Sequence, residues 1–147
     1  PGALIQMRGP IGWFYLQDET SPVVMVAGGV GITPIRALFK ELEKGNERNV
    51  TLIYSARESY LFKDELDAIA ARDPKISIVY THTVEDTQAA LKNELNINGS
   101  AAHYFISGAP LMITGISKVI TDNGVNKNAS SQIRLRDTSR NTTPNII

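Results

Sequence analysis

An apolar run that breaks into a glycine-rich turn is the feature of this sequence that most constrains its fold. Pro22 precedes residues 23–26, which are apolar, mostly β-branched and without alternation. Such a run is typical of a strand buried on both faces of a parallel sheet. Glycines follow where the backbone must turn sharply and another molecule can approach it closely, at Gly28, Gly29 and Gly31.

The turn leads directly into a predicted helix. Thr33 can cap that helix, and Pro34 suits its first turn because a missing N–H costs nothing there. Apolar residues then recur at helical spacing, at Ile35, Leu38, Phe39 and Leu42. A buried strand, a tight turn and a helix N-terminus together make a site for a phosphate-bearing cofactor. The general pattern Gly-x-Gly-x-x-Gly is not met, since a proline stands at its last position, and a glycine turn without a ligand stays an alternative.

Composition and charge exclude several other kinds of function. The chain has 147 residues, a formal net charge of +0 and no basic run, which argues against nucleic-acid binding. No apolar segment is long enough to span a bilayer, so we expect a cytoplasmic protein without a membrane contact. Cysteine is absent, which excludes disulfides, thiolate catalysis and cysteine-bound metals. We interpret the two isolated histidines, His82 and His103, as structural and predict no metal site.

Strand-like and helix-like segments alternate along the chain, which predicts an α/β fold. Further strands are predicted at 50–54, 76–80, 103–106 and 132–135, and helices at 63–72 and 110–123. Residues 86–95 are only weakly helical, and 96–100 resemble a turn. We therefore expect a five-stranded parallel, Rossmann-like sheet in the order 3-2-1-4-5, with helices on both faces and a short N-terminal β segment before it.

A second turn of small residues, 107–110, follows the fourth predicted strand. In a parallel sheet of this order, ligands bind beyond the carboxyl ends of the strands, at the switch point between the first and fourth strands. The turns 28–34 and 107–110 are therefore predicted to face each other across one crevice.

Several stretches of the sequence match, in order, the motifs of one known family. The turn 28–34 is similar to its Gly-Gly-x-Gly-Ile-Thr-Pro, and residues 54–57 and 62–66 are similar to its second strand end and next helix. Residues 104–112 look like its strand before a Cys/Ser-Gly-Pro-Pro-x-Met turn, with Ala109 in place of the first proline. From residue 22 onward the chain thus resembles the NAD(P)H-binding module of the ferredoxin–NADP reductase superfamily of flavin oxidoreductases.

The resemblance implies where a nicotinamide cofactor would bind. Its diphosphate and ribose would lie against the glycine turn and helix start, at Gly28, Gly29, Val30, Gly31, Ile32, Thr33 and Pro34. The opposite wall would be Ser107, Gly108, Ala109 and Pro110, with Met112 packed beneath it. Thr33 would lie near the nicotinamide and Ser107 beside the path of hydride transfer, which makes these two the candidate catalytic residues. Simple close packing is the alternative for Ser107 and Ala109.

The choice between NADP and NAD is predicted from the residues after the second strand. An acidic residue there holds the ribose 2′-OH of NAD, whereas an arginine can take the 2′-phosphate of NADP. The chain has Ser55 and Arg57 with no acid before Glu58, which slightly favours NADP. The alternative is a solvated Arg57 paired with Glu58 or Asp64.

The N-terminal segment also resembles the family. Residues 8–14 are similar to the last strand of its flavin-binding barrel and to the turn that touches the flavin, which implies contacts at Gly9, Pro10 and Gly12. The predicted organisation is a barrel remnant at 1–20, an NAD(P)H-binding domain at 21–136 and a flexible tail at 137–147. The family's main flavin motif, Arg-x-Tyr-Ser/Thr, does not occur in the sequence, which leaves FAD binding open.

Two functions of different classes follow. In the first, the chain is the NAD(P)H-binding module of a flavin-dependent oxidoreductase and orients nicotinamide for hydride transfer to FAD or FMN, with a flavin domain or electron-transfer partner. In the second, it is a non-catalytic nucleotide-binding or protein-interaction domain. There the N-terminal strand, with exposed Ile11, Trp13 and Phe14, is an association edge that can support an oligomer.

Overall fold

Five parallel strands in the order β3-β2-β1-β4-β5 form the sheet. The structure, a computed structural model, describes residues 14–16, 18–125 and 133–137. In sequence order the strands are β1 (Val23–Gly28), β2 (Val50–Ser55), β3 (Ile76–Thr81), β4 (His103–Gly108) and β5 (Ile133–Asp137). The predicted α/β class, parallel sheet and strand order are confirmed, with the switch point between β1 and β4.

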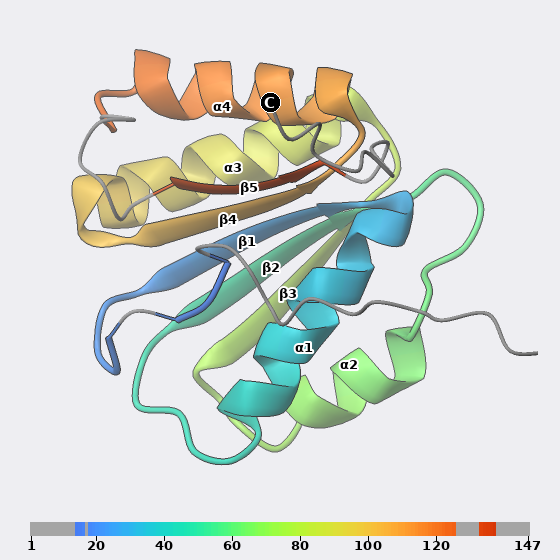
Figure 1. Ribbon diagram of the computed structural model, residues 1–147, viewed down its shortest axis with the longest axis vertical. Coiled ribbons are helices and arrows are strands. Elements are labelled where there is room, and N and C mark those ends of the chain that lie inside the picture. Colours follow the sequence, from blue (N-terminus) through green and yellow to red (C-terminus); the bar gives the residue numbers. More distant parts are fainter. Residues whose placement is uncertain (1–13, 17, 126–132, 138–147) are drawn as a thin grey trace, which may run out of the picture.

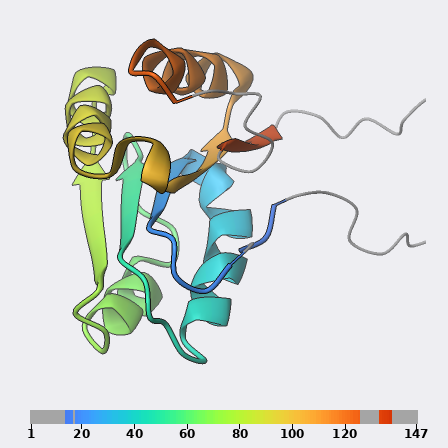
Figure 2. The same cartoon turned by 90° about the vertical axis from the view of Figure 1, so that its left-hand side faces the viewer.

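Helices cover both faces of this sheet (Figure 1). They are α1 (Ile32–Leu42), α2 (Lys63–Ala70), α3 (Val84–Asn98) and α4 (Pro110–Asp122). Seen from the side, α1 and α2 lie on one face and α3 and α4 on the other (Figure 2). The molecule is therefore a three-layer sandwich whose strands all end at the same edge of the sheet.

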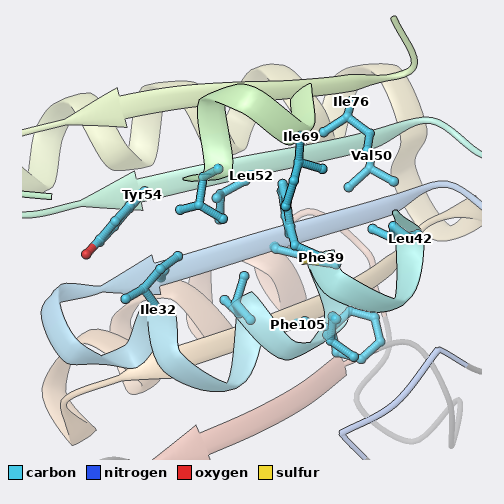
Figure 3. Close-up of a cluster of buried hydrophobic side chains, with 14 of the residues drawn as sticks. Ile32, Phe39, Leu42, Val50, Leu52, Tyr54, Ile69, Ile76 and Phe105 are labelled. Carbon is cyan, nitrogen blue, oxygen red and sulfur yellow. The ribbon is translucent and has the colours of Figure 1, made fainter. Parts of the chain in front are cut away.

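The central strand has no solvent-facing side, which explains its unbroken apolar sequence. Val23 and Met25 belong to the cluster of buried side chains between the sheet and α1 and α2. Phe39 of α1 and Leu52 of β2 belong to the same cluster (Figure 3). Val24 and Val26 belong to the second cluster, under α3 and α4. Successive side chains of a strand point to opposite faces, so a strand covered on both sides must be apolar at every position.

The third helix is longer than the weak helix predicted at residues 86–95, and it includes part of the turn predicted at 96–100. α3 runs over Val84–Asn98, and a short 3₁₀ turn, η2 (Gly99–Ala101), replaces the expected loop. Thr83 caps the helix by accepting a hydrogen bond from Asp86 N at 3.0 Å. Leu91 and Leu95 are buried against the sheet. This packing outweighs the poor helix propensity of the asparagines near the helix end, because tertiary contacts supply most helical stability in proteins.

Other element boundaries in the structure differ from the predicted ones by only a few residues. α2 ends at Ala70, two residues before the predicted end at Arg72. Asp137, predicted to begin the flexible tail, is the last residue of β5 and pairs with Gly108. The predicted barrel remnant is described only from Phe14 onward, and the tail at 138–147 lies outside the described residues.

One carboxylate on α2 binds two cations on α1. Arg36 donates Nε to Glu65 Oε2 at 2.7 Å and Nη2 to Oε1 at 3.1 Å, and Lys40 Nζ lies 2.9 Å from Oε1. The hydrogen bonds from Arg36 and then Lys40 lower the pKa of Glu65 from 4.5 to about 2. The unfolded chain therefore binds this proton at higher pH than the folded one. The network stabilises the fold above about pH 4.5 and is lost as the pH falls toward about 2.

We expect Glu65→Gln to weaken the acid dependence of stability in that pH range. The measurement is the urea midpoint as a function of pH for the parent chain and the variant. Glu41→Gln is the matched control, because Glu41 is also part of an ion pair on α1 but its side chain is 64% exposed. Parallel pH profiles for the parent and Glu65→Gln would contradict this assignment.

Candidate functional site

The glycine turn after β1 is itself helical. Residues 29–31 form a 3₁₀ turn, η1 (Gly29–Gly31), and α1 follows at Ile32 with Gly31 as its N-cap. Thr33 was predicted to cap the helix, and this was wrong: its hydroxyl donates to Val30 O at 2.9 Å from inside the first turn. The helix starts earlier than expected because η1 runs straight into it. Pro34 lies in the first turn, as predicted.

Two of the glycines are required by the packing of this turn. A Cβ on Gly31 would lie 2.5 Å from the Ser107 carbonyl carbon and 2.8 Å from Gly108 N, and it would also overlap the Ser107 oxygen. A Cβ on Gly28 would overlap Met112 Sδ. Gly31 therefore brings the two predicted turns into direct contact at Ser107, at the switch point of the sheet.

A pocket of about 490 Å³ opens beside this contact, above the carboxyl ends of β1, β2 and β3. Six predicted binding residues line it: Gly28, Gly29, Val30, Ser55, Arg57 and Met112. Gly29 has a φ of +50°, and nothing lies within 4 Å of the position that a Cβ would take. The pocket therefore has bare backbone on one side and the residues after β2 on the other.

The other predicted binding residues do not line this pocket. Gly31, Ile32, Ser107 and Gly108 are buried, Thr33, Ala109 and Pro110 are exposed, and Pro34 is half-buried. Met112 alone of the 107–112 segment reaches the pocket, where it lies against Gly28. The hollow therefore extends from the glycine turn toward β3, away from β4.

Eight residues that line the pocket were not predicted from the sequence. They follow or end two neighbouring strands: Tyr54, Ala56, Glu58, Ser59, Leu61, His82, Thr83 and Val84. Parallel strands bring their carboxyl ends to one edge, so the residues after the third strand could have been included on topology alone. His82 had been interpreted as structural. Its Nδ1 lies 3.1 Å from Ala56 O, so the ring joins the segments after β2 and β3 at the pocket.

Ser107 carries an unusual polar group for a core position. Its side chain is fully buried, and its hydroxyl has no hydrogen-bond partner in the structure. A buried hydroxyl without a partner costs about 1–3 kcal/mol of desolvation. Such a group at the end of β4, in contact with the glycine turn, is a candidate for interaction with a ligand.

His103, the other histidine, has a structural partner at the opposite end of the sheet. Its Nε2 lies 2.8 Å from Asp18 Oδ2, just before β1. No group of three or more His, Cys, Asp or Glu side chains that could hold a metal ion is found among the described residues. Within those residues there is likewise no helix long and apolar enough to cross a membrane.

The N-terminal predictions are only partly within the described part of the chain. Gly9, Pro10 and Gly12, the predicted flavin contacts, lie outside it, as do Ile11 and Trp13. Phe14 was expected to be exposed, and this was wrong: it is half-buried, and its ring meets Phe105 edge-on at 5.2 Å between centroids. Phe14 therefore packs against the core through Phe105.

Known proteins with a similar sequence include a reductase and an electron transfer component. The chain is 29% identical to the toluate 1,2-dioxygenase electron transfer component of Pseudomonas putida over 84% of its own length and 40% of that protein's. It is also 29% identical to NADH-cytochrome b5 reductase 1 of Mortierella alpina, over 90% and 50% of the two chains. The chain thus spans half or less of these relatives.

A solved structure shares the fold. The FAD/NAD-binding domain of nitric oxide dioxygenase from Vibrio cholerae superposes with a TM-score of 0.73 at 23% identity, over 87% of this chain and 55% of that one. The family model described as the oxidoreductase NAD-binding domain matches residues 25–118, which include the glycine turn, β2, β3 and Ser107. With its strand order and glycine turn, this chain belongs to the oxidoreductase NAD-binding domain family.

Proposed function

We propose that the pocket above β1, β2 and β3 binds NAD(P)H and that the chain is the nicotinamide nucleotide-binding module of a flavin-dependent oxidoreductase. The observation that carries the proposal is the side-chain-free wall of the pocket at Gly28 and Gly29, next to a helix N-terminus in a chain of this family. A diphosphate needs such a close approach to backbone N–H groups.

The residues present fit a nucleotide diphosphate. The first turn of α1 contains no acidic residue, so nothing on the helix competes with a phosphate for its N-terminal dipole. Gly29 leaves open space where any other residue would carry a side chain. Val30 is 61% exposed at the rim, where it can cover one side of the bound cofactor.

We assign the nicotinamide end to the contact between the two turns. Thr33 and the segment 107–110 flank this contact, and the Ser107 hydroxyl lies buried there without a hydrogen-bond partner. NAD(P)H, when bound, supplies the hydride. The chain's own residues orient the ring and exclude water, which is the usual contribution of protein to cofactor chemistry.

The hydride acceptor in this proposal is a flavin held by the flavin-binding half of the reductase. The relatives that carry the comparison are named as electron transfer and cytochrome b5 reductase proteins, and this chain spans 40% and 50% of their lengths. Purified protein whose flavin absorbance bleaches on addition of NAD(P)H would support this role. Nucleotide binding without bleaching, when a flavin-binding half is supplied, would instead support the non-catalytic binding domain.

A direct test of the site is calorimetric titration with NADPH and NADH. Gly29→Val fills the open side of the phosphate wall and places a β-branched residue at a positive φ, so both nucleotides should lose binding. Unchanged binding in this variant, or no binding of either nucleotide to the parent chain, would contradict the proposed site.

We further propose that Arg57 selects NADPH over NADH through the 2′-phosphate. Arg57 lines the pocket just after β2, where the ribose of the adenosine would lie. Replacing it with alanine should weaken NADPH binding about tenfold, since a hydrogen bond to a charged group contributes about 1.5–3 kcal/mol and this one is near solvent. NADH binding should change less than twofold.

Arg72→Ala is the matched control for Arg57→Ala. It removes the same charge from an exposed arginine that binds Glu43 at 2.8 Å and does not line the pocket. Equal losses of NADPH and NADH affinity in Arg57→Ala would show that Arg57 does not discriminate between them.

A further inference from the structure

Tyr54 is one of the residues that line the nucleotide pocket. It stands at the carboxyl end of β2 and is fully buried. Figure 3 shows its hydroxyl oxygen at the same end of the core cluster as Ile32, the first residue of α1. The tip of the ring therefore lies below the glycine turn.

The hydroxyl of Tyr54 bonds to both walls at once. It donates to Gly29 O at 3.3 Å and accepts from Leu61 N at 3.0 Å. Gly29 belongs to the phosphate-binding turn, and Leu61 belongs to the segment between β2 and α2; both line the pocket. A single hydroxyl thus connects two segments that are distant in sequence.

The segment bonded to Tyr54 has a backbone conformation that needs support. Phe62, next to Leu61, has a φ of +61° and a ψ of +20°, the left-handed conformation that an aromatic residue rarely adopts. Such residues persist only where surrounding contacts hold them. Two contacts do so here: the Tyr54 bond to the neighbouring amide, and the Arg36 guanidinium, 4.7 Å from the centre of the Phe62 ring.

We propose that Tyr54 is a positioning residue that fixes the width of the nucleotide pocket before the cofactor binds. The inference rests on the proposed function, since it assigns a role within the same pocket. Burial raises the pKa of the Tyr54 hydroxyl, so the group keeps its proton and can donate to Gly29 while it accepts from Leu61. Because both capacities are used inside the protein, Tyr54 acts through the two walls and not through a contact of its own hydroxyl with the nucleotide.

The test is Tyr54→Phe, which deletes only the hydroxyl. The ring keeps its edge-on contact with Tyr60, 5.1 Å between centroids, while Gly29 O and Leu61 N lose their bonds to the hydroxyl. We expect NADPH and NADH to bind about tenfold more weakly and by the same factor, since the lost hydrogen bonds lower the fraction of chains with a formed pocket. Arg57→Ala, in contrast, should discriminate between the two.

Tyr80→Phe is the matched control. Tyr80 belongs to the same aromatic cluster, and its hydroxyl donates to Asp67 at 2.6 Å, away from the pocket. This variant should lower thermal stability yet leave both affinities unchanged. Hydrogen exchange adds a readout without nucleotide: the Leu61 amide should exchange faster in Tyr54→Phe but not in Tyr80→Phe.

The outcomes separate this inference from the function on which it rests. If neither nucleotide binds the parent chain, the proposed function fails and the role of Tyr54 with it. If the parent binds and Tyr54→Phe binds equally well, or if both tyrosine variants lose the same affinity, only the role of Tyr54 is overturned. An equal loss for both nucleotides in Tyr54→Phe alone, with faster exchange at Leu61, supports it.

Discussion

Gly31→Ala should destabilise the fold by about 3 kcal/mol and abolish nucleotide binding, because overpacking typically costs about 1–3 kcal/mol and the backbone that the methyl meets here cannot move aside. The added methyl would stand 2.5 Å from the Ser107 carbonyl carbon and 2.8 Å from Gly108 N. These atoms belong to β4, which is paired on both sides by β1 and β5. Relief requires separating η1 from the sheet, and that movement also displaces the turn that we propose binds the phosphates.

Two other glycines provide controls for this prediction. Gly28→Ala meets the side chain of Met112, which can change rotamer, so its loss of stability should be smaller. Gly115→Ala makes the same chemical change inside α4, where nothing lies within 4 Å, and should stabilise the chain by about 1 kcal/mol. Urea unfolding of the three variants measures these differences. A Gly31→Ala variant as stable as the parent would show that the two turns do not need to touch.

Asp18→Ala should cost about 2 kcal/mol of stability, although the residue lies at the end of the molecule opposite the pocket. Its Oδ1 accepts hydrogen bonds from Ser21 N at 2.7 Å and Thr20 N at 3.0 Å, and its Oδ2 lies 2.8 Å from His103 Nε2. Burial alone would raise the pKa of this carboxyl, but the bonds from Ser21, His103 and Thr20 hold it well below its ordinary range. The charge is therefore present throughout the neutral range.

Because of Arg48, replacing Asp18 should cost more folding stability than replacing an ordinary surface carboxylate. The Arg48 side chain is only 5% exposed, and its Nη1 lies 3.6 Å from Asp18 Oδ1. Removing one partner of such a pair leaves a buried charge uncompensated. The Asp18 side chain is 38% exposed, which keeps the expected cost below that of a fully buried pair.

Thermal or urea unfolding of Asp18→Ala, Asp18→Asn and Glu19→Ala tests this assignment. The asparagine retains an acceptor for the turn at Ser21 but not the charge, so it should lose part of the stability that alanine loses. Glu19→Ala removes the neighbouring exposed carboxylate and should change stability by less than about 0.5 kcal/mol. Equal effects of the two alanine substitutions would refute a special role for Asp18.

The parallel α/β sheet could be predicted from the sequence because local patterns indicate it, and its strand order followed from assuming a doubly wound sheet with one switch point. β1 is apolar at every position, and each helix carries apolar residues on one face, so alternation alone gives the parallel sheet. α3 was underestimated because its asparagines are poor helix formers and its stability comes from contact with the sheet, which no local pattern records.

Only part of the pocket lining could be predicted, because short motifs record local sequence and not contacts between distant segments. Gly28, Gly29 and Arg57 belong to short motifs, and their place at the pocket follows from the ends of β1 and β2. Tyr54 and His82 are single residues whose role depends on neighbours distant in sequence, such as Gly29 for Tyr54 and Ala56 for His82. A motif cannot reveal a contact between segments that only the folded sheet brings together.

The central position of β1 has a consequence for how the chain folds. β1 pairs with β2 on one side, but its other partner is β4, with Val23 opposite His103. While the ribosome has made only the first three strands, one edge of β1 and the apolar side chains of Val24 and Val26 have no cover. The sheet is therefore complete on this side of β1 only after β4 has emerged. Until then, the strand that leads into the glycine turn has an unpaired edge, and unpaired strand edges are prone to aggregation.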